Sequence, residues 1–165
     1  MVKKQLFVTP NRCTACRNCE VACSFVHTVN PVALARPRVR VYALSETKNT
    51  VNLCLQCEEA ACQKVCPVEA LIRNEKTGAI EVNLQRCIRC MMCTIACPFG
   101  NIYLDEEASE IIKCDLCHGD PACAKFCPTL ALEYAENPSP DLKPHEIKLL
   151  PPIPWMLFAN PPAKK

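Results

Sequence analysis

The sequence predicts an α+β fold in which short strands and short helices surround loops that are rich in cysteine. Three observations support this prediction. Sixteen of the 165 residues are cysteines, and they fall into four similar runs. A short segment with strand character lies near each run, so the chain contains an internal repeat. Only 5% of the residues are aromatic, so large side chains are too few for an ordinary core, and the cysteines are the candidates to hold the chain together.

The four cysteine runs share one spacing with small variations. They are Cys13-x2-Cys16-x2-Cys19-x3-Cys23, Cys54-x2-Cys57-x4-Cys62-x3-Cys66, Cys87-x2-Cys90-x2-Cys93-x3-Cys97 and Cys114-x2-Cys117-x5-Cys123-x3-Cys127. Proline follows the last cysteine of the second, third and fourth runs, whereas Ser24 follows the last cysteine of the first. Because proline ends a helix and serine does not, the chain is expected to continue helically through residues 25–27.

Strands are predicted on both sides of the runs. Residues 5–9 are expected to form a strand that leads into the first run, and residues 30–38, which contain two prolines, a connector. Residues 38–42 alternate polar and apolar side chains, as a half-buried strand does. Residues 70–72 and 80–82 predict a hairpin between the second and third runs, with a polar turn at 76–78. Residues 101–104 and 131–134 are predicted strands after the third and fourth runs.

The spacing within the runs indicates iron–sulfur clusters. Three cysteines at i, i+3 and i+6 allow one tight loop to supply three ligands of a [4Fe–4S] cluster, while the fourth cysteine ligates the neighbouring cluster. The amides of such a loop form a concave anion site. Structural zinc instead uses two cysteine pairs separated by a longer span, so zinc and disulfides are the less favoured alternatives. Sixteen cysteines supply four clusters with none left over, and His118, inside the fourth run, is not required as a ligand.

Charge and composition exclude several classes of protein. The formal net charge of +2 becomes about −6 when four clusters, each about −2 with its thiolates, are counted, so the chain is not predicted to bind nucleic acid. No apolar stretch is long enough to span a bilayer, and the N-terminal residues show no signal peptide. Thiol ligands in the cytoplasm are therefore favoured over disulfides in a secreted protein, although a subunit can also be exported already folded on a partner's signal.

Seven basic residues in or beside the runs are candidates to offset the charge of the clusters. They are Arg12, Arg17, Lys64, Arg86, Arg89, Lys113 and Lys125. For each of them a solvated surface charge is an equally good interpretation. The sequence does not separate the two roles.

The second and fourth runs resemble those of a known family. The segments are Cys54-Leu-Gln-Cys57…Ala61-Cys62-Gln-Lys-Val-Cys66-Pro67, Lys113-Cys114-Asp-Leu-Cys117 and Cys127-Pro128. They are similar to the four-cluster electron-transfer subunits of the dimethyl-sulfoxide-reductase iron–sulfur family, and the resemblance covers residues 1–134. It implies two ferredoxin-like units, each with two [4Fe–4S] clusters. The compact length resembles that of the small subunits of tungsten aldehyde oxidoreductases and related soluble enzymes.

The runs are expected to exchange their fourth cysteines in pairs. The hairpin between the second and third runs has the layout of a two-cluster ferredoxin, which predicts the sets Cys54, Cys57, Cys62 with Cys97 and Cys87, Cys90, Cys93 with Cys66. The first and fourth runs remain to pair, as the resemblance also implies, in the sets Cys13, Cys16, Cys19 with Cys127 and Cys114, Cys117, Cys123 with Cys23. Spacing alone leaves open a pairing of the first run with the second and of the third with the fourth. On the favoured scheme, residues 1–134 form one core, with residues of about 50–99 as one unit and the first and fourth runs as the other.

The composition changes after about residue 135. Eight of the 15 prolines lie between Pro138 and Pro162, and no cysteine does. Residues 135–165 are therefore predicted to form an extended, proline-rich tail. Its apolar centre contains Trp155, Met156, Leu157 and Phe158, which are candidates for a partner interface because aromatic residues and methionine are enriched at interface centres. The alternative is that the tail covers apolar surface on its own core.

These patterns predict an electron-transfer subunit without catalytic residues. Each cluster has a complete cysteine set, no nucleophile–base group stands out, and no Gly-rich nucleotide motif is present. The expected partner is a catalytic oxidoreductase subunit, with a tungsten or molybdenum pterin type favoured, and a flavin subunit or a ferredoxin is a candidate second redox partner. The alternatives are a subunit of a formate dehydrogenase, a hydrogenase or a carbon monoxide dehydrogenase, a free-standing polyferredoxin, or a scaffold that uses metal only structurally.

Overall fold

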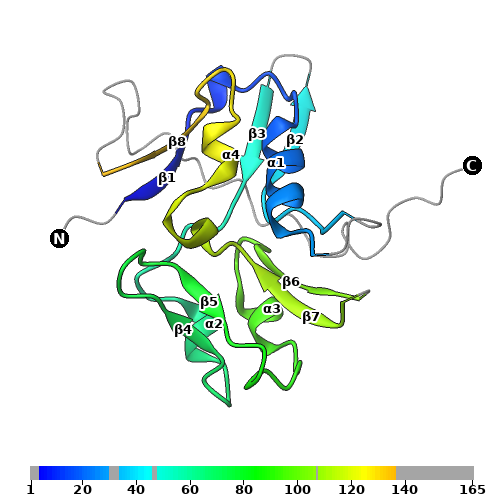
Figure 1. The fold of residues 1–165 in the computed structure, drawn as a ribbon, viewed down its shortest axis with the longest axis vertical. Helices are drawn as coiled ribbons and strands as arrows, with labels where there is room; N and C mark the ends of the chain where they lie inside the picture. The colour runs from blue at the N-terminus through cyan, green and yellow to red at the C-terminus, as the bar shows by residue number, and fades with distance from the viewer. Residues whose placement is uncertain (1–3, 30–33, 46–47, 107, 137–165) are drawn as a thin grey trace, which may run out of the picture.

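The computed structural model describes residues 4–29, 34–45, 48–106 and 108–136. Within these ranges the strands form four two-stranded antiparallel sheets, and short helices lie between them (Figure 1). Paired short strands with few helices are compatible with the predicted α+β class. The candidate interface residues Trp155, Met156, Leu157 and Phe158 lie outside the described residues.

The two ends of the described chain form one sheet. Strand β1 (Gln5–Val8) pairs with β8 (Leu132–Ala135), so that Gln5 lies opposite Ala135. A short 3-10 helix, η1 (Pro10–Arg12), follows β1 and leads into the first cysteine run. These elements bring the first run beside the fourth, because β8 directly follows the last cysteine of the fourth run and its proline turn.

Two helices from the first and fourth runs pack together. Helix α1 (Asn18–His27) carries the buried cysteines Cys19 and Cys23 and continues to His27, which confirms the helical continuation predicted from Ser24. The short helix α4 (Ala122–Lys125) packs against it, as Figure 1 shows. The Glu20 carboxylate accepts a hydrogen bond of 2.6 Å from the Val41 amide, so α1 is also fixed to the neighbouring hairpin.

That hairpin consists of β2 (Arg40–Ser45) and β3 (Lys48–Asn52). Strand β2 begins two residues later than the alternating pattern predicts and extends further. Strand β3 was not predicted, because its sequence KNTVN is polar except for one valine and lacks a clear alternation. Val41 and Val51 lie opposite each other and are buried with Val39, Leu53 and Leu132 in a first hydrophobic core.

A second core lies around the second and third cysteine runs. The predicted hairpin is confirmed as β4 (Leu71–Arg73) paired with β5 (Ile80–Val82). A second pair, β6 (Ile102–Asp105) with β7 (Glu110–Lys113), completes the strands of this part. The short helices α2 (Ala61–Lys64) and α3 (Met92–Ala96) follow the first ligands of the two runs. The core contains Leu71, Ile80, Ile102 and Ile111, so it extends to β7, beyond the expected range of about 50–99.

Hydrogen bonds and a ring contact join the two cores. The Asn101 side-chain amide donates to the Leu53 carbonyl at 2.7 Å, and the Tyr103 hydroxyl donates to the Pro37 carbonyl at 2.6 Å. The Arg40 guanidinium lies 4.5 Å from the centre of the Tyr103 ring, at cation–π distance. In the described ranges no helix has the length and apolar character needed to cross a membrane.

Candidate metal centres

The third residue of all four cysteine runs takes the same unusual backbone conformation. The third residue of each run is left-handed, with φ of 55°, 50°, 58° and 56° at Ala15, Gln56, Arg89 and Leu116. The fifth residue of the first, third and fourth runs, Arg17, Met91 and His118, is left-handed too, and in the fourth run residues 116–118 are left-handed in succession. A residue with a side chain rarely takes this conformation, and alternation with right-handed residues turns successive N–H groups to one side. The repeated strain therefore indicates loops shaped to surround an anionic group.

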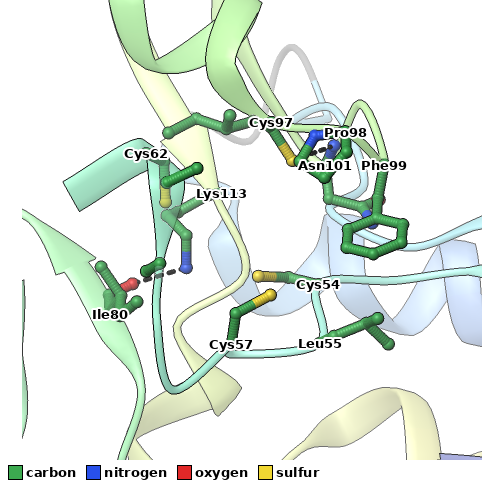
Figure 2. A pocket seen from close by; sticks show the side chains of 13 residues that line it. Cys54, Leu55, Cys57, Cys62, Ile80, Cys97, Pro98, Phe99, Asn101 and Lys113 are labelled. Atoms are coloured by element: carbon green, nitrogen blue, oxygen red, sulfur yellow. Dashed lines mark hydrogen bonds between the residues drawn. The ribbon is translucent and has the colours of Figure 1, made fainter. Parts of the chain in front are cut away.

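Two of the four predicted ligand sets each line a cavity. The sulfur atoms of the set in Figure 2 point into one space, and this set consists of Cys54, Cys57, Cys62 and Cys97. A second cavity is lined by Cys13, Cys16, Cys19 and Cys127. In each case three cysteines of one run meet the fourth cysteine of another run, because β1 pairs with β8 and α2 packs beside α3.

The thiols of the other two predicted sets influence one another. Burial, with the nearby Cys87, Cys62 and Cys66 thiols, raises the pKa of Cys93 to about 11. Burial also raises the pKa of Cys123, as do the thiols of Cys114, Cys23 and Cys117. The structure thus brings Cys66 beside the third run and Cys23 beside the fourth. Cys90, the remaining predicted ligand, is exposed.

The donor set fits an iron–sulfur cluster. All 16 cysteines are free thiols, and burial, the Glu20 charge and crowding by Cys127 and Cys13 together raise the pKa of Cys19 to about 12. Thiols that crowd in this way require a cationic centre to displace their protons. Sets of four soft sulfur ligands are typical of zinc or of iron–sulfur clusters, and the anion-binding backbone favours a cluster, which carries negative charge.

Backbone amides also donate to ligand sulfurs at the end of the runs. The Ala70 amide donates to Cys66 Sγ at 3.2 Å, and the Arg38 amide donates to Cys23 Sγ at the same distance. The Asn101 amide lies 3.5 Å from Cys97 Sγ. Hydrogen bonds to ligand sulfur are among the factors that set cluster potentials, so these amides are part of the candidate centres.

A half-buried polar cluster beside Cys23 was not predicted from the sequence. The Arg38 guanidinium lies 2.6 Å from the Asp115 carboxylate, and His27 Nε2 lies 3.2 Å from it. Burial alone would raise the pKa of Asp115, but the hydrogen bond with His27 and the Arg38 charge hold it well below its usual range. His27, Asp115 and Cys117 place donor atoms within 4.8 Å of one another, yet Cys117 belongs to a predicted cysteine set. No sequence signal marked the three side chains as neighbours.

The candidate counter-charges differ in position. Lys64 forms an exposed ion pair with Glu59, and Lys125 forms one with Asp120. Arg12 lies 3.3 Å from Glu133, and Arg17, Arg86 and Arg89 are exposed. Lys113 alone among the seven candidates is buried, and it lines the cavity with Cys54. His118 is exposed and lies 3.8 Å from Glu81, outside the cysteine sets.

Comparisons with known proteins agree with these centres. A family model described as a 4Fe-4S dicluster domain matches residues 45–137, and one described as a 4Fe-4S binding domain matches residues 10–26. The chain is 39% identical over 124 residues to the polyferredoxin-like subunit of the aliphatic sulfonate oxidoreductase of Pyrococcus furiosus, with 74% of this chain and 70% of that protein covered.

Two further relatives are subunits of other oxidoreductase systems. The chain is 35% identical over 162 residues to formate hydrogenlyase subunit 2 of Escherichia coli, with 76% of this chain and 78% of that protein covered. It is 35% identical over 137 residues to the thiosulfate reductase electron transfer subunit PhsB of Salmonella typhi, with 74% and 70% covered. These relatives are similar over most of their length.

Proposed function

Because the chain belongs to the 4Fe-4S dicluster domain family, we propose that it holds four [4Fe–4S] clusters and carries electrons between a catalytic subunit and a second redox partner. The chain is an iron–sulfur electron-transfer protein, and its function is not catalytic. The observation that carries the proposal is the convergence of cysteines from different runs on shared cavities. When bound, each cluster takes up and releases one electron, while the protein supplies ligands, hydrogen bonds and charge.

We assign the ligands as the sequence analysis predicts, with exchange of fourth cysteines. The four sets are Cys13, Cys16, Cys19 and Cys127; Cys114, Cys117, Cys123 and Cys23; Cys54, Cys57, Cys62 and Cys97; and Cys87, Cys90, Cys93 and Cys66. The lining of the two cavities supports the first and third of these sets. The mutual influence of the buried thiols supports the other two.

We infer that the four sets follow one another in a row. Cys123, in the second set, has Cys19 of the first set among the thiols that raise its pKa after burial. Burial raises the pKa of Cys114, and Cys54 of the third set raises it further. Cys62 of the third set likewise acts on Cys93 of the fourth. This order supports a path for single electrons that runs through both cores.

The ends of this row are open to solvent. Cys16 and Cys90 are the exposed cysteines, and they belong to the first and last sets. Exposed apolar residues flank Cys90 in the sequence, among them Ile88, Met91 and Ile95. An apolar surface beside an accessible ligand suits contact with a redox protein, so we propose that electrons enter and leave the chain at these two ends.

The type of partner is inferred from the relatives and the family resemblance. The relatives are named as subunits of a sulfonate oxidoreductase, a formate hydrogenlyase and a thiosulfate reductase. We propose a tungsten or molybdenum pterin subunit as the catalytic partner, as in the dimethyl-sulfoxide-reductase iron–sulfur family, and a flavin subunit or a ferredoxin as the second redox partner. Sixteen ligand thiols favour the reducing cytoplasm as the site of assembly.

Metal analysis tests the proposed function directly. The anaerobically purified chain is expected to contain about sixteen irons and about sixteen inorganic sulfides, since each cluster supplies four of each. Reduction with dithionite should produce the EPR signals of interacting [4Fe–4S]⁺ clusters. Stoichiometric zinc in place of iron would show that the metal has only a structural role, and iron that stays EPR-silent with a reductant stronger than dithionite would contradict electron transfer.

A pair of cysteine substitutions tests the exchange of fourth ligands. Cys57→Ser and Cys97→Ser are each expected to remove about four irons, and the double variant no more than either alone, because both residues are assigned to one cluster. Cys97→Ser combined with Cys90→Ser should remove about eight, because these residues are assigned to different clusters. The reverse pattern in iron analysis would assign Cys97 to the cluster of its own run.

A further inference from the structure

Lys113 is a buried charge at the joint between the two cores. The residue is 3% exposed, although lysine is almost never fully buried unless it is paired. Its ammonium nitrogen donates to the Ile80 carbonyl at 2.7 Å, to the Cys114 carbonyl at 3.0 Å and to the Gln56 side-chain oxygen at 3.1 Å. These acceptors come from a hairpin of the second core, from the fourth cysteine run and from the second run.

The three contacts require the protonated form of Lys113. An ammonium group has three N–H donors and no acceptor, whereas a neutral amine has only two N–H donors. All three partners of the nitrogen are oxygen acceptors. Gln56 fixes this arrangement, because its side-chain nitrogen donates to the Cys114 carbonyl at 2.8 Å while its oxygen accepts from Lys113 and from the Ile80 amide.

The buried ammonium has no carboxylate partner within the described ranges. No ion pair there includes Lys113, and its acceptors are neutral. A buried cation without an opposite charge is strongly destabilising. The thiolates of the candidate centres are candidate anions, because Lys113 lines the cavity of Cys54, Cys57, Cys62 and Cys97 (Figure 2) and directly precedes Cys114.

The Lys113 side chain adjoins two of the proposed ligand sets. It lines the cavity with Cys54, Cys57, Cys62 and Cys97 of the third set, and its ammonium nitrogen lies 3.0 Å from the carbonyl oxygen of Cys114 in the second set. One ammonium is therefore placed beside two neighbouring sets.

We propose that Lys113 is the shared counter-charge of the two middle clusters of the row and raises the reduction potential of both. The proposal rests on the proposed function. Reduction adds one electron to a cluster, and a fixed positive charge nearby stabilises the more negative, reduced form. Lys113 gains and loses no proton in this step. It is a positioning residue that makes the two inner clusters easier to reduce than they would otherwise be, so that electrons cross the joint between the cores.

The test is an EPR-monitored redox titration of the full chain with its clusters bound. Lys113→Met and Lys113→Gln remove the charge, and Lys113→Arg keeps it. In both neutral variants, two of the four clusters should show at least a tenfold fall in the ratio of reduced to oxidised form at a fixed potential, which is a shift of about 59 mV for one electron. Lys113→Arg should shift the two clusters by less than either neutral variant.

Lys64→Met is the matched control, because Lys64 lies two residues after Cys62 but its ammonium is exposed and paired with Glu59. It should leave all four potentials unchanged. Unchanged potentials in both neutral variants would overturn the proposal, and so would equal shifts in all three Lys113 variants, which would indicate a purely steric role. If Lys113→Arg binds four clusters and the two neutral variants bind fewer, the positive charge is needed for cluster assembly, as expected of a counter-charge. If all three Lys113 variants lose clusters, the proposal is wrong. An unmodified chain without reducible clusters would instead refute the proposed function.

Discussion

The chain stripped of its metal is expected to lose its cooperative fold. The largest fully buried side chains are Ile80, Ile111 and Leu132, and much of the remaining core is cysteine, alanine and valine. Isolated two-stranded sheets are marginal in water, as are helices shorter than about 12 residues, and α2, α3 and α4 have four or five residues. Ligation must therefore supply much of the folding free energy.

The size of this effect exceeds ordinary domain stability. Structural metal sites contribute on the order of 10–16 kcal/mol each in small metal-binding domains, whereas a whole domain is stable by about 5–15 kcal/mol. Circular dichroism of the chelated, reduced chain should show loss of secondary structure and of the thermal transition, and anaerobic addition of iron and sulfide should restore both. An apo chain that still melts cooperatively would contradict this expectation.

Removal of the proline-rich tail is expected to dissociate the complex while leaving the clusters in place. The tail carries no cysteine, and burial of Trp155 and Phe158 in a partner would contribute about 2–3 kcal/mol each. Two such side chains correspond to a change in Kd of about a thousandfold or more. The truncated chain should end at Glu136, because Ala135 pairs with Gln5 in the sheet of β1 and β8.

The readout is the dissociation constant for the catalytic subunit, together with iron content. The double variant Trp155→Ala/Phe158→Ala should reproduce the truncation, and Lys164→Ala/Lys165→Ala is the matched control that keeps the apolar centre. If the tail covers its own core instead, truncation will lower the melting temperature and leave the affinity for the partner unchanged. Stoichiometric co-elution of the truncated chain with the catalytic subunit at micromolar concentration would also show that the tail is not needed to bind the partner.

The sequence predicted the elements whose local pattern is strong. The hairpin of β4 and β5 follows from two apolar segments around a polar turn, and the length of α1 follows from Ser24 in place of proline. Strand β3 was not predicted, because its sequence is mostly polar and the strand forms by pairing with β2. Helices of four or five residues are too short to show a helical period.

The candidate centres show the same division. The proposed ligands follow from cysteine spacing, because those assigned to one loop are neighbours in sequence. The burial of Lys113 cannot be predicted from the sequence pattern, because its three hydrogen-bond acceptors come from residues 56, 80 and 114. The same holds for the contact of Asp115 with His27 and Arg38. Sequence pattern cannot rank seven similar cations when tertiary contacts alone separate the buried one from the exposed ones.

The pairing of β1 with β8 determines the order in which the two cores can fold during synthesis. Gln5 and Ala135 pair although they lie about 130 residues apart along the chain, and contacts of such separation form late. During synthesis the core that ends at β7 can close first, since all its strands and helices are contiguous. The N-terminal run must wait for Leu132–Ala135 to leave the ribosome before β1 has a partner strand and Cys13, Cys16 and Cys19 meet Cys127. Until then these thiols are exposed to oxidants and to other metal ions. Protection of the N-terminal cysteines therefore depends on the last strand of the core to be translated.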